Sequence, residues 1–186
     1  MKKIYIISTY TGTVLSSIIK RISRKPYSHI SIALDESLNT MYSFGRLNPR
    51  NPLFAGFVEE GIDKGLYEIR KNTICRVYSM EVSEESFKSL HKNIEDIADR
   101  RNLYRYDVLS LITIPLGIQR NPEYGYVCSS FVADVLSKSG INILDKEHFF
   151  VQPNDFFDLP GLTLEYEGLL SKYSGRFENS FELAFA

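Results

Sequence analysis

Alternating apolar and polar residues predict a series of β-strands, mostly in the first half of the chain. The runs with this pattern are residues 3–8, 29–34, 40–44, 66–69 and 74–82. Turn-forming residues at 35–39 separate two of these runs, so we expect those two to form a hairpin. Residues 46–65 contain two prolines and three glycines, and this composition predicts a long surface loop.

A second pattern, with apolar residues three and four positions apart, predicts helices. The clearest helix begins after Ser83, whose hydroxyl suits an N-cap, and ends at Arg100 and Arg101, whose charges suit a helix C-terminus. Its apolar face consists of Phe87, Leu90, Ile94, Ile97 and Ala98. Other helices are expected over residues 14–22, 107–114 and 126–137.

The length of the chain and the spread of these elements predict a single domain, residues 1–186. A chain of this length buries enough surface to form a core without disulfides or a metal ion. A loop at 152–155 is expected to lead into another helical turn. Residues 162–186 have only a weak pattern, so we expect a loosely ordered C-terminal tail.

The charges are nearly balanced, with 22 Lys and Arg residues against 23 Asp and Glu residues and a net charge of −1. No global basic field attracts nucleic acid or anionic lipid, although a local patch is compatible with these numbers. Only four apolar residues precede the first polar stretch, too few for a signal peptide. The longest apolar run, residues 108–114, is too short to span a membrane. We expect a cytoplasmic protein with reduced cysteines.

The two cysteines, Cys75 and Cys128, are the candidates for a thiol nucleophile. Cys128 falls in the first turn of the helix expected over 126–137, where backbone N–H groups and the helix dipole favour a thiolate and can bind an oxyanion. The alternative is a buried cysteine with a purely structural role, which is common for free cysteines. Cys75 lies within the strand expected over 74–82 and is interpreted as inert core.

A cysteine nucleophile also needs a general base, and the chain has three histidines. His29 begins the strand expected over 29–34, whereas His91 and His148 have charged and polar neighbours and are expected to face solvent. We therefore select His29, with a strand-end histidine bonded to the backbone as the alternative. The histidines are far apart in sequence and none has a partner at ligand spacing, so we expect no metal and no cofactor.

Several segments of the chain together resemble one protein family. These segments are Tyr27-Ser28-His29-Ile30-Ser31-Ile32-Ala33-Leu34, Tyr42-Ser43-Phe44, Tyr126-Val127-Cys128-Ser129-Ser130-Phe131-Val132 and Pro153-Asn154-Asp155. They are similar to the circularly permuted branch of the papain-like NlpC-type superfamily, which includes YiiX-like bacterial proteins and the lecithin:retinol acyltransferase group. In that branch the histidine strand precedes the cysteine helix, as it does here. The resemblance implies an α+β fold in which a central antiparallel sheet or half-barrel packs against helices, with Cys128 at a helix N-terminus facing the His29 strand.

The resemblance also implies roles for the matching residues. Cys128 is the nucleophile, and His29 is the general base and acid. The family places a third polar residue on the strand after the histidine strand, and the matching position here is Ser43. A serine can accept a hydrogen bond from an imidazole but cannot stabilise an imidazolium as a carboxylate does. Glu59 and Glu60 are an alternative source of the missing carboxylate.

Residues close to these positions are candidates for substrate binding. Arg46, with Arg50, is placed to bind a carboxylate of a substrate, although arginines in exposed loops are commonly only solvated. Tyr104 or Tyr106 is a candidate wall of the pocket, and Tyr126 is a candidate neighbour of the oxyanion, with simple packing as the alternative for each. The candidates for substrate binding are Tyr27, Arg46, Tyr104, Tyr126 and Ser129.

Together these expectations predict a cysteine-dependent hydrolase of amide bonds, a peptidase or amidase that uses a Cys128–His29 dyad. The resemblance to bacterial NlpC-type proteins implies peptides or amino-acid conjugates derived from the cell wall as substrates. A thiol acyltransferase or lipid hydrolase of the lecithin:retinol acyltransferase type is the alternative enzyme. A non-catalytic binding module on the same fold is the alternative class, because Ser43 departs from the usual third residue. The sequence leaves the oligomeric state open.

Overall fold

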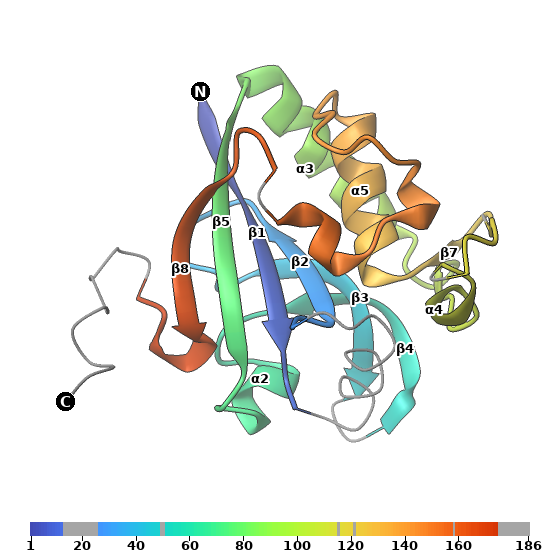
Figure 1. The fold of residues 1–186 in the computed structure, drawn as a ribbon, viewed down its shortest axis with the longest axis horizontal. Helices are drawn as coiled ribbons and strands as arrows, with labels where there is room; N and C mark the ends of the chain where they lie inside the picture. Colours follow the sequence, from blue (N-terminus) through green and yellow to red (C-terminus); the bar gives the residue numbers. More distant parts are fainter. Residues whose placement is uncertain (13–25, 49–50, 115, 121, 158, 175–186) are drawn as a thin grey trace.

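A six-stranded antiparallel sheet forms the centre of the protein (Figure 1). The computed structural model describes residues 1–12, 26–48, 51–114, 116–120, 122–157 and 159–174. The strands, in the order in which they lie in the sheet, are β4 (Asn51–Glu60), β3 (Met41–Asn48), β2 (His29–Ala33), β1 (Lys2–Tyr10), β5 (Ile74–Val82) and β8 (Thr163–Leu169). Two short strands, β6 (Arg105–Tyr106) and β7 (Gly125–Tyr126), form a separate parallel pair.

Helices cover both faces of this sheet. They are α2 (Gly65–Ile69), α3 (Glu84–Asp99), α4 (Ser110–Thr113) and α5 (Cys128–Lys138), together with the 3-10 turns η1 (His148–Phe150), η2 (Pro153–Phe156) and η3 (Leu170–Lys172). Helices α3 and α5 pack side by side against one face, whereas α2 contributes to the core on the other face (Figure 1). The expected α+β class, with an antiparallel sheet packed against helices, is therefore confirmed.

The alternation along each central strand explains why both faces of the sheet are buried. In β1, Ile4 and Ile6 point into the core beneath α3 and α5, whereas Tyr5 and Ile7 point into the core on the other face. Successive side chains of a strand point to opposite faces, so a strand with apolar residues at every position requires cover on both sides. The sheet is thus a central layer between two cores.

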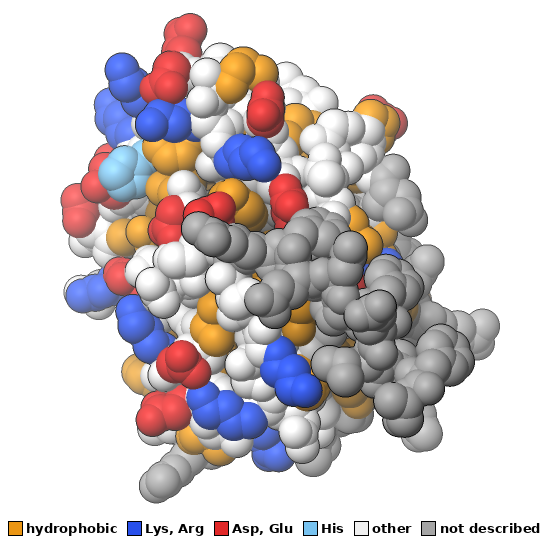
Figure 2. Space-filling view, turned by 90° about the vertical axis from the view of Figure 1, so that its left-hand side faces the viewer, with side chains coloured by type: hydrophobic (Ala, Val, Ile, Leu, Met, Phe, Trp, Pro, Cys, Tyr) orange, Lys and Arg blue, Asp and Glu red, His pale blue; other side chains and the backbone are white. Residues whose placement is uncertain are grey.

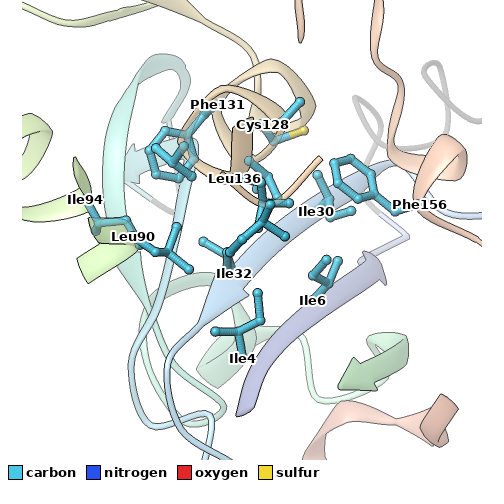
Figure 3. Close-up of a cluster of buried hydrophobic side chains, with 14 of the residues drawn as sticks. Ile4, Ile6, Ile30, Ile32, Leu90, Ile94, Cys128, Phe131, Leu136 and Phe156 are labelled. Atoms are coloured by element: carbon cyan, nitrogen blue, oxygen red, sulfur yellow. The ribbon is translucent and has the colours of Figure 1, made fainter. Parts of the chain in front are cut away.

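The larger core joins the sheet to α3 and α5 (Figure 3). Leu90 and Ile94 of α3, and Phe131 and Leu136 of α5, are almost fully buried against the strands. Figure 3 shows Cys128 at the end of the same helix as Phe131, with its sulfur turned to the side on which Phe156 lies. The packing of this apolar helix face therefore fixes the position of its first turn.

Most strand predictions are confirmed, but two assignments between residues 46 and 69 are wrong. Residues 66–69 belong to α2. The prediction of a strand was wrong because a pattern of only four residues cannot distinguish a strand from a helix. The loop expected over residues 46–65 is largely the end of β3 and the whole of β4, which pair as a hairpin. Pro52 fits this pairing because β4 is an edge strand, where proline is tolerated, and Gly56 lies within β4 opposite Gly45.

The helix predictions are also confirmed only in part. The helices after Ser83 and over residues 126–137 are confirmed as α3 and α5, whereas the helix over 107–114 is reduced to α4. The helix expected over 14–22 lies outside the described residues. The weakly patterned tail from residue 162 in fact begins with β8, which pairs with β5.

The face of the molecule over β8 carries acidic and basic side chains that are interspersed (Figure 2). This distribution agrees with the nearly balanced charge of the chain. Among the described helices, none combines the length and the apolar character that crossing a bilayer requires.

Replacing the N-cap of α3 should measurably destabilise the fold. Ser83 Oγ accepts a hydrogen bond of 3.0 Å from the backbone N–H of Ser86. Ser83→Ala removes this acceptor and should lower the free energy of unfolding by about 1 kcal/mol in urea denaturation. Ser86→Ala is the matched control, since it keeps the backbone donor. Equal stabilities of the two variants would contradict the capping role.

Candidate active site

Cys128 is the first residue of α5, immediately after the extended N-cap residue Val127. The backbone N–H of Val127 donates to Ser130 Oγ at 3.0 Å, and this hydroxyl lies 3.1 Å from the Val127 carbonyl oxygen. These bonds hold the first turn in place. The first N–H groups of an α-helix have no acceptor within the helix, so those at Cys128 and Ser129 are oriented to receive negative charge.

His29 and Glu60 form a partly buried ion pair. His29 begins β2 and Glu60 ends β4, and the imidazole Nε2 lies 3.1 Å from both carboxylate oxygens of Glu60. The side chains are only 19% and 12% exposed. Because a carboxylate only accepts hydrogen bonds, Nε2 carries a proton and donates it, which leaves Nδ1 to face another partner.

The structure brings Cys128 into contact range of this histidine. Burial alone would lower the pKa of His29, but the charge of Glu60 and the charge and hydrogen bonding of Cys128 outweigh it and hold the pKa well above 6.5. An imidazole of this kind keeps its proton to higher pH than an ordinary histidine does. Cys128, His29 and Glu60 therefore lie next to one another, with the imidazole between the thiol and the carboxylate.

The polar groups around Glu60 keep it ionised. Burial alone would raise the pKa of Glu60, but His29 and the hydroxyls of Ser31 and Ser43 lower it below its ordinary value. Ser31 Oγ donates to Glu60 Oε2 at 2.6 Å. Tyr67 and Thr9 extend this group, with a distance of 3.1 Å between their hydroxyl oxygens. A polar cluster thus lies within the otherwise apolar core on this face of the sheet.

Glu60, and not Ser43, is the side chain that pairs with His29. Ser43 is buried in β3, and its hydroxyl lowers the pKa of Glu60 by hydrogen bonding. The sequence offered Glu59 and Glu60 as alternatives, and the register of β4 decides between them. Glu60 lies opposite Met41, on the face of Ser43, whereas Glu59 points the other way and is exposed.

Gly45 provides the space that the ion pair occupies. A Cβ atom built at Gly45 would lie 3.3 Å from Val58 Cγ1 and 3.4 Å from both His29 Cε1 and Glu60 Oε1. The contact with Val58 is tighter than most side-chain contacts, and those with the ion pair are at the short end of the ordinary range, so a side chain larger than a methyl group would press on the ion pair.

Tyr106 and Arg46 lie on the Cys128 side of the site. Burial raises the pKa of Tyr106 well above 10, with Cys128 as a further contributor, and Arg46 acts in the opposite direction. Arg46 lies in β3, two residues after Phe44 and on the same face. Tyr104 is half-buried and stacks on Tyr126, with ring centroids 5.9 Å apart. Arg46 and Tyr106 are thus near the thiol, whereas Tyr104 supports the aromatic packing behind it.

Three other predicted binding residues have structural partners. The Tyr126 hydroxyl donates to Asp134 Oδ2 at 2.5 Å, one and a half turns along α5 from Cys128. Ser129 Oγ donates to the carbonyl oxygen of Val151 at 2.5 Å. The Tyr27 hydroxyl donates to Glu167 Oε1 at 3.2 Å, on β8. Each of these hydroxyls is therefore committed within the fold and is not directed at Cys128.

The remaining candidates lie outside this site. Cys75 is buried in β5, and burial together with the nearby charge of Glu167 raises its pKa to about 12. His91 is half exposed beside Glu95 on α3, and His148 Nδ1 lies 3.9 Å from Asp134. Within the part of the chain that the structure describes, no three His, Cys, Asp or Glu side chains gather as a metal site.

Comparisons with known proteins identify no family for this chain. No protein-family model matches the sequence, and no curated protein matches it significantly. The resemblance to papain-like NlpC-type proteins therefore stays a hypothesis based on short motifs.

Adding a methyl group at Gly45 should disturb the ion pair. Gly45→Ala should reduce the alkylation rate of Cys128 at pH 6 by roughly 3- to 10-fold, because the new methyl group crowds Val58 at 3.3 Å and contacts both members of the ion pair at 3.4 Å. Gly56→Ala is the matched control across the hairpin, since its Cβ atom would contact Leu47 and the Tyr104 carbonyl oxygen and neither member of the ion pair within 4 Å. Equal rates for the two variants would show that the space beside His29 is not limiting.

Neutralising Glu60 should change stability in a pH-dependent way. The raised pKa of His29 stabilises the fold fully below about pH 6.5, and this contribution is lost as pH rises through the folded-state pKa. The lowered pKa of Glu60 stabilises the fold above about pH 4.5, and this contribution is lost as pH falls through the folded-state pKa. Both contributions to the free energy of unfolding are therefore complete only between about pH 4.5 and pH 6.5.

Glu60→Gln should therefore cost most between about pH 4.5 and 6.5, on the order of 1.5–3 kcal/mol in urea denaturation. NMR titration should show that the His29 pKa falls in this variant. Glu59→Gln is the matched control, since Glu59 is exposed on the other face of the same strand. A cost that does not vary with pH would contradict the ion pair.

Proposed function

We propose that this protein is a cysteine-dependent hydrolase of amide bonds, in which Cys128 is the nucleophile and His29 the general acid and base. The observation that carries this proposal is the contiguous arrangement of Cys128, His29 and Glu60, with the thiol at a helix N-terminus. A buried structural cysteine does not require a charged histidine beside it, nor a carboxylate held against the far side of that histidine. This combination of groups is what nucleophilic catalysis requires.

The reaction follows from the positions of these groups. The Cys128 thiolate attacks the carbonyl carbon of the amide, and the resulting oxyanion is stabilised by backbone N–H groups at the start of α5. The His29 imidazolium protonates the leaving nitrogen as the carbon–nitrogen bond breaks, and a thioester with Cys128 remains. Neutral His29 then accepts a proton from water, which attacks the thioester and releases a carboxylic acid. This step restores the thiolate and the imidazolium.

Glu60 orients His29 in this scheme and does not exchange protons. Its two oxygens hold Nε2 at 3.1 Å, so that in this scheme the other ring nitrogen, Nδ1, exchanges the proton. The lowered pKa of Glu60 keeps it ionised in the working pH range, so that it stabilises the imidazolium in each half of the reaction. This role is one that Ser43 could not fill.

The substrates that fit best are small peptides or amino-acid conjugates. Arg46 lies near Tyr106 on the Cys128 side of the site, where a guanidinium can bind a substrate carboxylate. Amides of peptides derived from the cell wall carry such carboxylates and are our first candidates. An acyltransferase would share the first half of the reaction and differ only in the group that attacks the thioester.

Alkylation kinetics test the central pair directly. The protein is treated with iodoacetamide between pH 5 and 9, and labelled cysteines are mapped by mass spectrometry. At pH 6, Cys128 should react at least ~10-fold faster than a free thiol with a pKa of about 8.5, because His29 is protonated and favours the thiolate. Cys75 is the internal control and should stay unlabelled in the folded protein, because burial and the charge of Glu167 raise its pKa to about 12.

The variants separate an enzyme from a binding module. His29→Ala should abolish the fast labelling at pH 6, while His91→Ala, the control, should retain it. The same variants are assayed for release of nitroaniline from acylated amino-acid nitroanilides, where only the control should match the wild type. If Cys128 reacts no faster than a free thiol, the hydrolase proposal fails and the binding module becomes the better explanation.

A further inference from the structure

A cluster of exposed apolar side chains lies in the segment that connects β6 to β7. We call it the α4 surface and define it by the five residues Val108, Leu109, Ile112, Leu116 and Ile118, each of which is more than half exposed. Large aliphatic side chains that gather in this way on a folded protein are typical of interaction sites. The segment projects from the body of the molecule beside α5 (Figure 1).

The local backbone places most of these side chains on one face. Helical hydrogen bonds run through this segment, from Ile112 N to Leu109 O, from Ile114 N to Ser110 O and from Leu116 N to Thr113 O. In such a segment, positions 108, 109, 112 and 116 share one face. Ser110 and Ile114, on the opposite face, are buried against the protein. The segment is therefore amphipathic, with its apolar face outward.

Arginines outnumber acidic residues beside the α4 surface. Residues 108–122 contain no Asp or Glu, and the segment 100–122 holds four arginines, Arg100, Arg101, Arg105 and Arg120, against the single acidic residue Asp107, with Asp99 and Glu123 directly outside it. Arg120 pairs with Asp107 at 3.4 Å, whereas Arg105 is exposed at the start of β6. Exposed arginines beside an apolar face are complementary to a binding partner that has an apolar interior and an anionic outer layer.

We infer that the α4 surface binds the interface of a bilayer that contains anionic phospholipid. Its aliphatic side chains would enter the boundary between headgroups and acyl chains, and the arginines would bind the lipid phosphates. A protruding aliphatic ridge suits this soft boundary better than a protein partner, whose recognition usually depends on aromatic residues that fill pockets. The nearly balanced net charge of the chain is compatible with this inference, because the attraction is local.

The position of the α4 surface links it to the candidate active site. It lies between Tyr106, which is near Cys128, and Tyr126, two residues before Cys128. Binding through this surface would hold the thiol close to the headgroup layer. If the proposed function holds, the substrate amide would be presented at a membrane. The binding of the α4 surface to the membrane does not depend on the proposed function.

Vesicle flotation tests this inference with the full chain. The wild type should float with vesicles of phosphatidylcholine that contain roughly 30% phosphatidylglycerol, and should bind at least ~10-fold more weakly to phosphatidylcholine alone. Ile112→Ser/Leu116→Ser should reduce binding at least ~10-fold. Phe54→Ser/Ile69→Ser is the matched control, since both side chains are more than half exposed elsewhere, and it should bind as the wild type does. High salt should weaken wild-type binding several-fold.

Defined results would overturn the inference. These are a lack of binding to either vesicle, equal binding by Ile112→Ser/Leu116→Ser and the wild type, or a dimer in light scattering that this variant abolishes, which would assign the surface to a second copy of the chain. Cys128→Ser keeps the α4 surface and should bind vesicles normally. Conversely, Ile112→Ser/Leu116→Ser should keep the fast alkylation of Cys128. Failure of the membrane inference and failure of the proposed hydrolase are thereby distinguished.

Discussion

The structure depends on the ion pair between His29 and Glu60, which lies inside a largely apolar core. A charged imidazole in such a place is costly unless a negative group meets it. The carboxylate of Glu60 does so, and Ser31 donates a further hydrogen bond to it. Gly45 has no side chain, and this leaves room for the ion pair. A core that accommodates these groups has given up apolar packing, so the pair is not explained by a gain in stability alone.

Two independent parts of the fold meet at this pair. The sheet positions the histidine and the carboxylate, and the apolar face of α5 positions the cysteine. Phe131 and Leu136 fix the helix against the strands, so the location of Cys128 is set by packing that is remote from its sulfur. Rigid elements on both sides therefore hold the three side chains at fixed relative positions.

The sequence was sufficient for the parts of the site that depend on local pattern. Cys128 could be placed at a helix start and His29 at a strand start because periodicity and turn residues define those positions. Glu60 could not be selected over Glu59, because the choice depends on the register of β4, and prolines and glycines concealed that strand. The partners of Tyr27 and Tyr126 were missed for a related reason, since Glu167 and Asp134 come close to these tyrosines only through tertiary packing.

The pairing of β3 with β4 makes the site sensitive to insertions and deletions in an uneven way. A deletion of one residue within 55–58 would shift the alternation, so that Glu60 turns to the exposed face and Glu59 turns inward at the position opposite Ser43. The irregularity of the hairpin lies elsewhere, between Arg46 and Asn48, close to its tip. Length changes there leave the alternation that precedes Glu60 intact. Changes of length are therefore compatible with the site at the tip of the hairpin. They are not compatible with it at the base of β4, where the side chain of Glu60 must point toward His29.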